Sequence, residues 1–221
     1  MIRKTLQFFF AIFCCTSLFS STAVFATNIK PASILVLGDS LSSAYGIDSD
    51  QGWVTLLQHQ LTQNGYEYRV INASVSGDTT RTGLSRIKTA LLSHTPEIVI
   101  IALGGNDGLR GFAFSEIENS LANIIERCQQ SNAKVLLVGV RLPPNYGPIY
   151  TQKFTTLYQN LAHHFDVPLA PKILNQVADK PALMQQDGIH PTAEAQPQIM
   201  WNVWSSLEPL LAGNKNKATN Q

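Results

Sequence analysis

The sequence predicts an α/β protein: a three-layer α/β/α sandwich around a central, mostly parallel five-stranded sheet. Two observations predict this fold class. Continuous apolar runs are typical of strands buried on both faces, as in a parallel sheet, and four such runs occupy residues 33–38, 68–72, 97–103 and 134–140. Each run is followed by a stretch with apolar residues at three- and four-residue spacing, as expected of the crossover helices in β-α-β units. These stretches occupy residues 53–63, 82–92, 115–129 and 150–164.

The last quarter of the chain predicts one more strand and a closing helix. A weaker apolar run at residues 167–169 is the expected fifth strand, and residues 192–211 are the expected helix. We expect Trp201 and Trp204 on or near the buried face of this helix. Pro197 should lie in its first turns, where the missing N–H of proline matters least.

Composition indicates one globular domain with little net charge. The chain has 221 residues, of which 44% are hydrophobic and 14% charged, with a formal net charge of +1. This length suits a single domain, expected over residues 27–212 and followed by a polar tail at 213–221. This composition excludes a disordered acidic chain, and the small net charge gives no indication of the basic surface that binds nucleic acid. We therefore expect a small, uncharged or weakly charged substrate and no nucleic-acid partner.

The amino-terminal segment has the pattern of a signal peptide at residues 1–26. Arg3 and Lys4 precede a short apolar run, and small residues follow as far as Ala26, the expected cleavage point. The run is shorter than the roughly 20 residues that a membrane-spanning helix needs. The mature protein should therefore be periplasmic or secreted, without a stable membrane span. It keeps one cysteine, Cys128, which excludes an internal disulfide and is typical of a core residue.

Polar residues follow the predicted strands where a parallel α/β sheet binds its ligands, at the carboxyl ends. Ser40 comes directly after the first strand and is the candidate nucleophile. His190, in a late loop, is the candidate base, and Asp187 lies three residues before it, where it can orient the imidazole. No His or Cys cluster has the spacing of metal ligands, so we expect no metal.

Three groups are candidates for an oxyanion hole. They are the backbone N–H of Ser40, the backbone N–H of Gly77, and the side-chain amide of Asn106. Each residue also has a simpler explanation: a serine after a strand is often a helix cap, and Gly and Asn are common in turns. The presence of all the parts of an acyl-transfer site favours a serine hydrolase.

Four segments resemble the four sequence blocks of the GDSL, or SGNH, hydrolase family. They are Gly38-Asp39-Ser40-Leu41-Ser42, the block at Gly77, Gly104-Gly105-Asn106-Asp107 and Asp187-Gly188-Ile189-His190-Pro191. The resemblance implies a flavodoxin-like fold and catalytic roles for Ser40, Gly77, Asn106 and His190, with Asp187 as the acid.

Residues 72–80, 109–111 and 141–147 are similar to a bacterial subfamily of multifunctional thioesterases, lysophospholipases and arylesterases. This likeness implies a periplasmic, cofactor-free enzyme that cleaves ester and thioester bonds of small acyl substrates. It also implies that the loop after Asn106 covers the acyl chain, with Asp107, Leu109 and Phe112 as substrate contacts. We further expect a monomer.

Other functions remain open at this point. A carbohydrate or other specialised esterase shares the triad, but its site usually has more aromatic and polar platforms. A non-catalytic flavodoxin-like binding protein should carry a phosphate-cradling glycine motif, and none is present. A phosphatase built on Asp39, or on Asp48 and Asp50, lacks a neighbouring histidine. The G-x-S-x-G elbow of α/β-hydrolases is also absent.

Overall fold

The computed structural model describes residues 31–170 and 172–211, and in this part of the chain the strands form one parallel five-stranded sheet. The strand order is β2-β1-β3-β4-β5, so the first strand in the chain lies inside the sheet, with β2 on one side and β3, β4 and β5 on the other. The strands are β1 (Ala32–Gly38), β2 (Tyr68–Asn72), β3 (Ile98–Ala102), β4 (Lys134–Val138) and β5 (Leu169–Ala170). The expected parallel sheet is confirmed.

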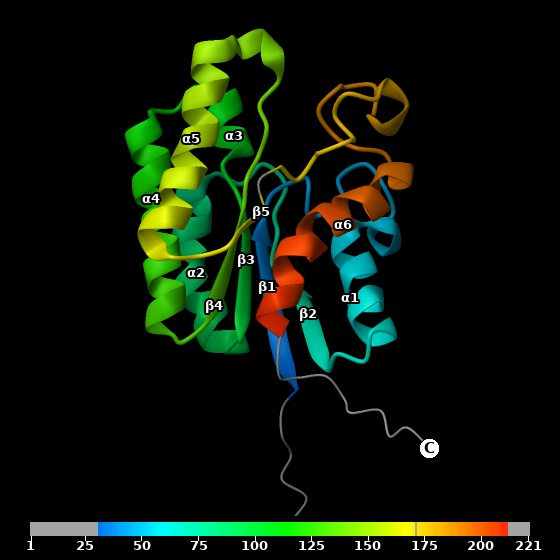
Figure 1. Ribbon diagram of the computed structural model, residues 1–221, viewed down its shortest axis with the longest axis vertical. Helices are drawn as coiled ribbons and strands as arrows, with labels where there is room; N and C mark the ends of the chain where they lie inside the picture. The colour runs from blue at the N-terminus through cyan, green and yellow to red at the C-terminus, as the bar shows by residue number, and fades with distance from the viewer. Residues whose placement is uncertain (1–30, 171, 212–221) are drawn as a thin grey trace, which may run out of the picture. The chain divides into compact units, whose positions relative to one another are not determined.

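Helices cover both faces of the sheet, which makes the three layers visible in Figure 1. One layer holds α1 and α6, and the other holds α2, α4 and α5. The helices are α1 (Trp53–Gln63), α2 (Thr80–His94), α3 (Gly105–Leu109), α4 (Phe114–Gln130), α5 (Pro148–Phe165) and α6 (Gln196–Leu207). The signal peptide expected at residues 1–26 and the tail expected at 213–221 lie outside the described residues.

The core is split in two because successive strand side chains point to opposite faces of the sheet. In β1, Ile34 and Val36 pack toward α1 and α6, whereas Leu35 and Leu37 pack toward α2, α4 and α5. All four side chains are fully buried. A continuous apolar run therefore marks a strand with a helix layer on each side, as the sequence predicted. Cys128 lies in the second half of the core, and burial raises the pKa of its thiol to about 12.

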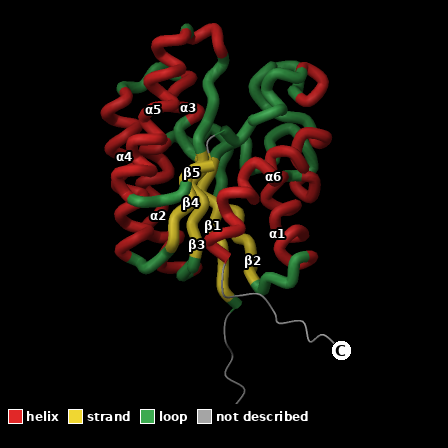
Figure 2. The backbone as a smooth tube through the Cα atoms, viewed as in Figure 1, coloured by secondary structure: helices red, strands yellow, loops and turns green. Residues whose placement is uncertain are grey.

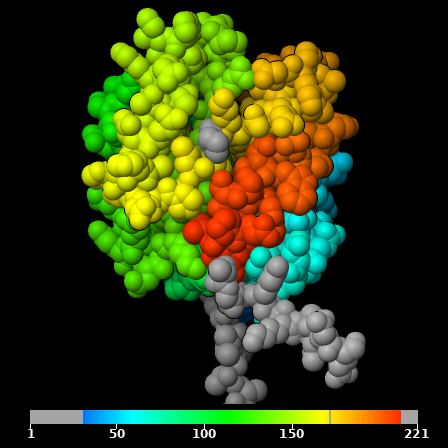
Figure 3. Space-filling view, in the orientation of Figure 1, coloured from blue at the N-terminus to red at the C-terminus, as the bar shows by residue number. Residues whose placement is uncertain are grey.

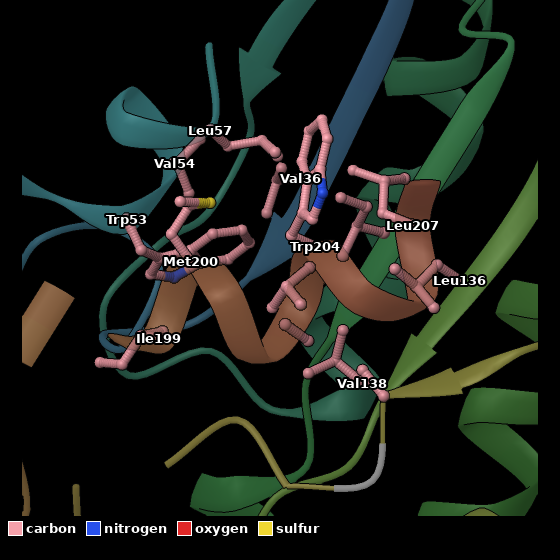
Figure 4. Close-up of a cluster of buried hydrophobic side chains, with 14 of the residues drawn as sticks. Val36, Trp53, Val54, Leu57, Leu136, Val138, Ile199, Met200, Trp204 and Leu207 are labelled. Carbon is pink, nitrogen blue, oxygen red and sulfur yellow. The ribbon is translucent and has the colours of Figure 1, made fainter. Parts of the chain in front are cut away.

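The closing helix partly departs from the sequence prediction. Residues 192–211 form α6 flanked by two short 3-10 turns, Ala193–Ala195 and Glu208–Leu211, and Pro197 lies in the first turn of α6 as expected. Trp204 is buried and points toward the sheet with Met200 and Leu207 (Figure 4). Trp201 is 49% exposed, so its expected burial was wrong. It follows Met200 by one residue, about 100° around the helix, which carries it off the buried stripe.

Three elements begin two residues away from their predicted start. The helix α2 begins two residues early because the Thr79 hydroxyl accepts the Thr82 N–H and caps it. The helix α5 begins at Pro148, a residue suited to the first turn. The strand β5 is displaced by a residue or two, since Pro168 has no N–H to give and only its carbonyl joins β4. In residues 31–170 and 172–211, no helix is long and apolar enough to cross a membrane.

Candidate active site

The loops that follow the strands gather at one end of the molecule, shown in green at the top of Figure 2. They enclose a cleft of about 240 Å³ that opens at the carboxyl edge of the sheet. In Figure 3 its two rims, the yellow-green segment after β4 and the amber segment before α6, stand next to each other. The cleft lies where the topology of a parallel α/β sheet puts a ligand site.

Ser40, His190 and Asp187 form a continuous hydrogen-bonded chain at this cleft. His190 Nδ1 lies 2.6 Å from Asp187 Oδ2, and His190 Nε2 lies 2.9 Å from Ser40 Oγ. An ionised carboxylate can only accept, so Nδ1 donates to it and Nε2 is left to accept the Ser40 hydroxyl proton. The structure thus brings together three residues that are up to 150 positions apart in the chain.

The surroundings of Asp187 keep its carboxylate ionised, so that it can accept the hydrogen bond from His190 Nδ1. Its side chain accepts hydrogen bonds from the His190 ring and from the backbone N–H groups of Ile189 and His190. These bonds favour the charged form and lower the pKa of Asp187 to about 2, the His190 ring making the largest contribution. The carboxylate stays ionised across the neutral range.

A residue that sequence reasoning missed ties the His190 loop to the Ser40 segment. The Gln185 side-chain amide donates to the carbonyls of Tyr45 and Pro191, each at 2.9 Å. The Tyr45 ring in turn contacts the His190 imidazole at a centroid distance of 4.4 Å, with the two ring planes tilted by 40°. No local signal marks Gln185, because the partner that ties it to the Ser40 segment, Tyr45, lies 140 residues away in the chain.

The three expected oxyanion donors have different environments. Among the described residues, the backbone N–H groups of Ser40 and Gly77 make no hydrogen bond. Gly77 has a φ of +84°, a conformation that disfavours any side chain. The Asn106 side chain lines the cleft and donates one of its two N–H bonds to the Asp78 carbonyl at 2.9 Å. Its other N–H bond remains for a ligand.

Asp39 is a buried carboxylate beside the nucleophile. It lines the cleft, is 2% exposed, and accepts the Leu41 N–H at 3.0 Å. Burial raises its pKa to about 6, because removing a carboxylate from water disfavours the charged form, and the hydrogen bond offsets only part of this.

Of the three residues expected to contact the acyl chain, one lines the cleft and two do not. Leu109 lines the cleft, whereas Asp107 and Phe112 are absent from the described residues that line it. The Asp107 carboxylate is buried and bonded to Thr80, and Phe112 packs against the core on the α4 side. The expected loop over residues 107–112 begins as the short helix α3, which turns Asp107 inward. The expectation for Asp107 and Phe112 as lining residues is therefore corrected.

The remaining cleft wall comes from segments that the sequence had not marked individually. The loop after β4 contributes Val140, Leu142 and Pro143, and the segment before α6 contributes Leu174 and Met184. These side chains make most of the wall apolar. The Arg141 guanidinium spans the two segments and donates to both oxygens of Asp179 at 2.9 Å.

Comparison with known sequences identifies the family. The sequence profile described as "GDSL-like Lipase/Acylhydrolase family" matches residues 36–196, which is more than half of the chain. The chain belongs to the GDSL, or SGNH, hydrolase family. It is therefore an ester hydrolase, and the alternative of a non-catalytic flavodoxin-like binding protein does not hold.

Similar proteins in this family carry esterase and thioesterase names. The chain is 48% identical to "Esterase TesA" of Pseudomonas aeruginosa over 80% of its length and 89% of that protein. It is 46% identical to "Arylesterase" of Vibrio mimicus over 75% and 83% of the two chains. It is 43% identical to "Thioesterase 1/protease 1/lysophospholipase L1" of Escherichia coli over 80% and 84%.

Solved structures of such hydrolases have the same fold. The crystal structure of TesA superposes with a TM-score of 0.80 at 48% identity, covering 80% of this chain and 99% of that one. The esterase EstA from Pseudoalteromonas sp. superposes with a TM-score of 0.77 at 37% identity, covering 81% and 98%. The expected GDSL hydrolase fold is therefore confirmed at the level of the whole domain.

Proposed function

We propose that this GDSL hydrolase cleaves ester and thioester bonds of acyl substrates through a triad of Ser40, His190 and Asp187. The observation that carries the proposal is the hydrogen-bonded chain from Ser40 Oγ to His190 and on to Asp187. A nucleophile, a base within hydrogen-bond reach, and a group that orients the base are the parts that acyl transfer requires.

The reaction proceeds in two steps. Ser40 Oγ attacks the acyl carbonyl carbon while His190 Nε2 takes the hydroxyl proton. The tetrahedral intermediate collapses, the bond to the alcohol or thiol breaks, and His190 returns the proton to that leaving group. A water molecule then attacks the acyl-enzyme, again losing its proton to His190, and the carboxylic acid leaves as Ser40 recovers its hydrogen.

Three N–H groups would stabilise the negative oxygen of each intermediate. The backbone N–H groups of Ser40 and Gly77 make no hydrogen bond among the described residues, and one N–H of the Asn106 amide is uncommitted. Donors that are oriented before the reaction need no reorganisation when charge develops. This supports the oxyanion hole that the sequence predicted.

The wall of the cleft supports an acyl chain as the bound group. Leu109, Leu142, Leu174 and Met184 are among its lining residues, and an apolar lining of this kind is typical of pockets that bind apolar groups. A carbohydrate esterase would need more hydrogen-bonding groups on this wall. The names of the arylesterase and thioesterase relatives agree with ester and thioester substrates.

A covalent label tests the nucleophile. A fluorophosphonate probe should modify Ser40, as located by peptide mass spectrometry, and Ser40→Ala should lose both labelling and hydrolysis of p-nitrophenyl butyrate. Ser42→Ala is the matched control, since Ser42 is a buried serine two residues away that makes no side-chain hydrogen bond among the described residues. Near-normal hydrolysis by a folded Ser40→Ala protein would overturn the proposal.

We also propose that the enzyme acts outside the cytoplasm after cleavage of residues 1–26. The support is the charged, apolar and small-residue pattern of this segment. Mass spectrometry of the protein from cell fractions should find Thr27 at its amino terminus in the periplasm or medium, and an intact Met1 would contradict this. Light scattering of the same preparation measures whether it is the expected monomer.

A further inference from the structure

Asp107 occupies a position that the acyl-contact expectation does not explain. Its carboxylate is 1% exposed and faces away from the cleft, toward the first turn of α2. Oδ1 accepts the Thr80 hydroxyl at 2.6 Å, and both oxygens accept the Thr80 backbone N–H, at 3.2 and 3.0 Å. Thr80 is also 1% exposed. The contact is therefore a buried, hydrogen-bonded link between two crossover segments.

This link joins the two segments that carry the proposed oxyanion donors. Asp107 directly follows Asn106 at the start of α3, and Thr80 lies three residues after Gly77 at the start of α2. Two other side-chain bonds join these segments near the donors within the described residues: the exposed Arg110 guanidinium donates to the Gly77 carbonyl at 3.3 Å, and Asn106 Nδ2 donates to the Asp78 carbonyl at 2.9 Å. The Asn106 bond orients the amide, whereas the link between Asp107 and Thr80 is the buried one and joins the starts of α3 and α2.

We propose that Asp107 is a positioning residue that sets the separation and orientation of Gly77 and Asn106 in the oxyanion hole. The inference rests on the proposed function, because it takes those two residues as oxyanion donors. Asp107 acts through Thr80 and touches no substrate.

The Asp107 carboxylate and the first turn of α2 stabilise each other. The first N–H groups of an α-helix have no partner within the helix, and its amino end attracts negative charge. A buried carboxylate, in turn, is costly unless donors surround it. The Asp107 and Thr80 groups satisfy each other, so displacing either one exposes an unpaired polar group. The link is therefore rigid, which a positioning role requires.

The same geometry predicts which kinetic constant changes. Oxyanion donors act on charge that develops only in the transition state, whereas ground-state affinity comes from the apolar wall. Asp107 does not line that wall. Loosening the link should thus lower kcat and leave KM nearly unchanged.

Four variants with p-nitrophenyl butyrate as substrate test this role. Asp107→Leu fills the space without a charge, and Thr80→Val removes only the hydroxyl. Asp107→Asn and Thr80→Ser are their conservative partners, since each keeps a hydrogen-bonding group at the link. Gln58→Ala is the control for lost part-buried hydrogen bonds, because the Gln58 side chain donates to the Tyr68 carbonyl and accepts from the Val70 N–H at β2, away from the cleft.

We expect kcat to fall about 100-fold in Asp107→Leu and about 10-fold in Thr80→Val, with KM within twofold, because losing one oxyanion donor costs roughly 100-fold to 1000-fold. Asp107→Asn and Thr80→Ser should recover most of the loss. Gln58→Ala should keep kcat although its melting temperature falls. All assays are run well below the melting temperature of each variant, measured by circular dichroism.

Two results would overturn the inference. One is a kcat within twofold of the parent in folded Asp107→Leu and Thr80→Val. The other is a loss that falls on KM as much as on kcat, or that Asn and Ser do not recover. Ser40→Ala, assayed in parallel, separates this inference from the proposed function. If Ser40→Ala is active, the triad proposal fails, whereas an inactive Ser40→Ala with unaffected Asp107 variants removes only the positioning role.

Discussion

One neighbouring carboxylate sets the tautomer of His190, so the residue scale is where the geometry of the site can be tested most directly. Asp187 accepts the Nδ1 proton of His190 and two backbone N–H groups. An asparagine can still accept the backbone bonds, but its amide no longer fixes the tautomer that leaves Nε2 free.

We expect Asp187→Asn to fold normally and to lose roughly three to four orders of magnitude in kcat. Steady-state kinetics and thermal melting of the same preparation measure both. Asp48→Asn, at an exposed aspartate in a loop, is the matched control and should retain full activity. An equal loss of stability and activity in Asp187→Asn would make Asp187 a structural residue.

Asp39 predicts a pH dependence of stability. Its pKa is raised from 3.8 to about 6, so the folded protein holds this proton more tightly than the unfolded chain does. The free energy of unfolding should therefore fall as pH rises from about 4 to about 6 and then level off. At about 1.4 kcal/mol per pKa unit, the change is about 3 kcal/mol.

Urea unfolding of the parent and of Asp39→Asn at several pH values checks this expectation. The difference between their unfolding free energies should change between pH 4 and pH 6 and stay constant above. Asp187 contributes little in this window, because its lowered pKa removes its stabilisation only as pH falls from about 4 toward 2. A flat difference would mean that Asp39 is solvated in the folded protein.

At the scale of elements, the active site depends on how loops from distant parts of the chain are held together. The Gln185 side chain joins the loop before α6 to the segment after Ser40. Gly46 lies against it, and a Cβ at residue 46 would overlap the Gln185 amide oxygen. Gly65 is also at positive φ, but a Cβ there would meet no atom within 4 Å.

These two glycines make a matched pair. Gly46→Ala and Gly65→Ala should each lower the unfolding free energy by about 1–2 kcal/mol through the left-handed backbone. Only Gly46→Ala should also displace Gln185 and reduce kcat, by up to about 100-fold if His190 moves by about 1 Å. Chemical unfolding and kinetics of both variants separate strain from misplacement. Equal kcat in the two variants would mean that Gln185 does not position His190.

At the scale of the whole molecule, the two helix layers stabilise the sheet that carries the site. Trp204 is buried in the layer of α1 and α6, whereas Trp201, on the same helix, is half exposed. Trp204→Ala should lower the unfolding free energy by about 3–5 kcal/mol, and Trp201→Ala should cost much less. Denaturant melts of both variants measure the difference. Similar losses would place Trp201 in the core.

The sequence predicted the elements best where a local pattern has one structural meaning. The run at residues 33–38 is apolar on both faces, and only a covered central strand satisfies that pattern. The prediction was wrong for Trp201, because a shift of one residue along a helix moves a side chain off its buried face. It was also wrong for α3, a segment with two glycines that was expected to be a loop and that tertiary contacts stabilise as a helix.

The sequence by itself determined the sheet, its layers and the chemistry of the candidate site, because apolar periodicity and the residues at strand ends are local properties. Ser40, His190 and Asp187 were predicted in this way as candidate catalytic residues, and the structure places His190 within hydrogen-bond distance of the other two. The tertiary structure decided which side chains face the cleft. Asp107 follows Asn106 directly, yet it points to the start of α2 while Asn106 faces the cleft. Contacts between distant segments, such as Gln185 with Tyr45, depend on long-range packing that no local pattern encodes.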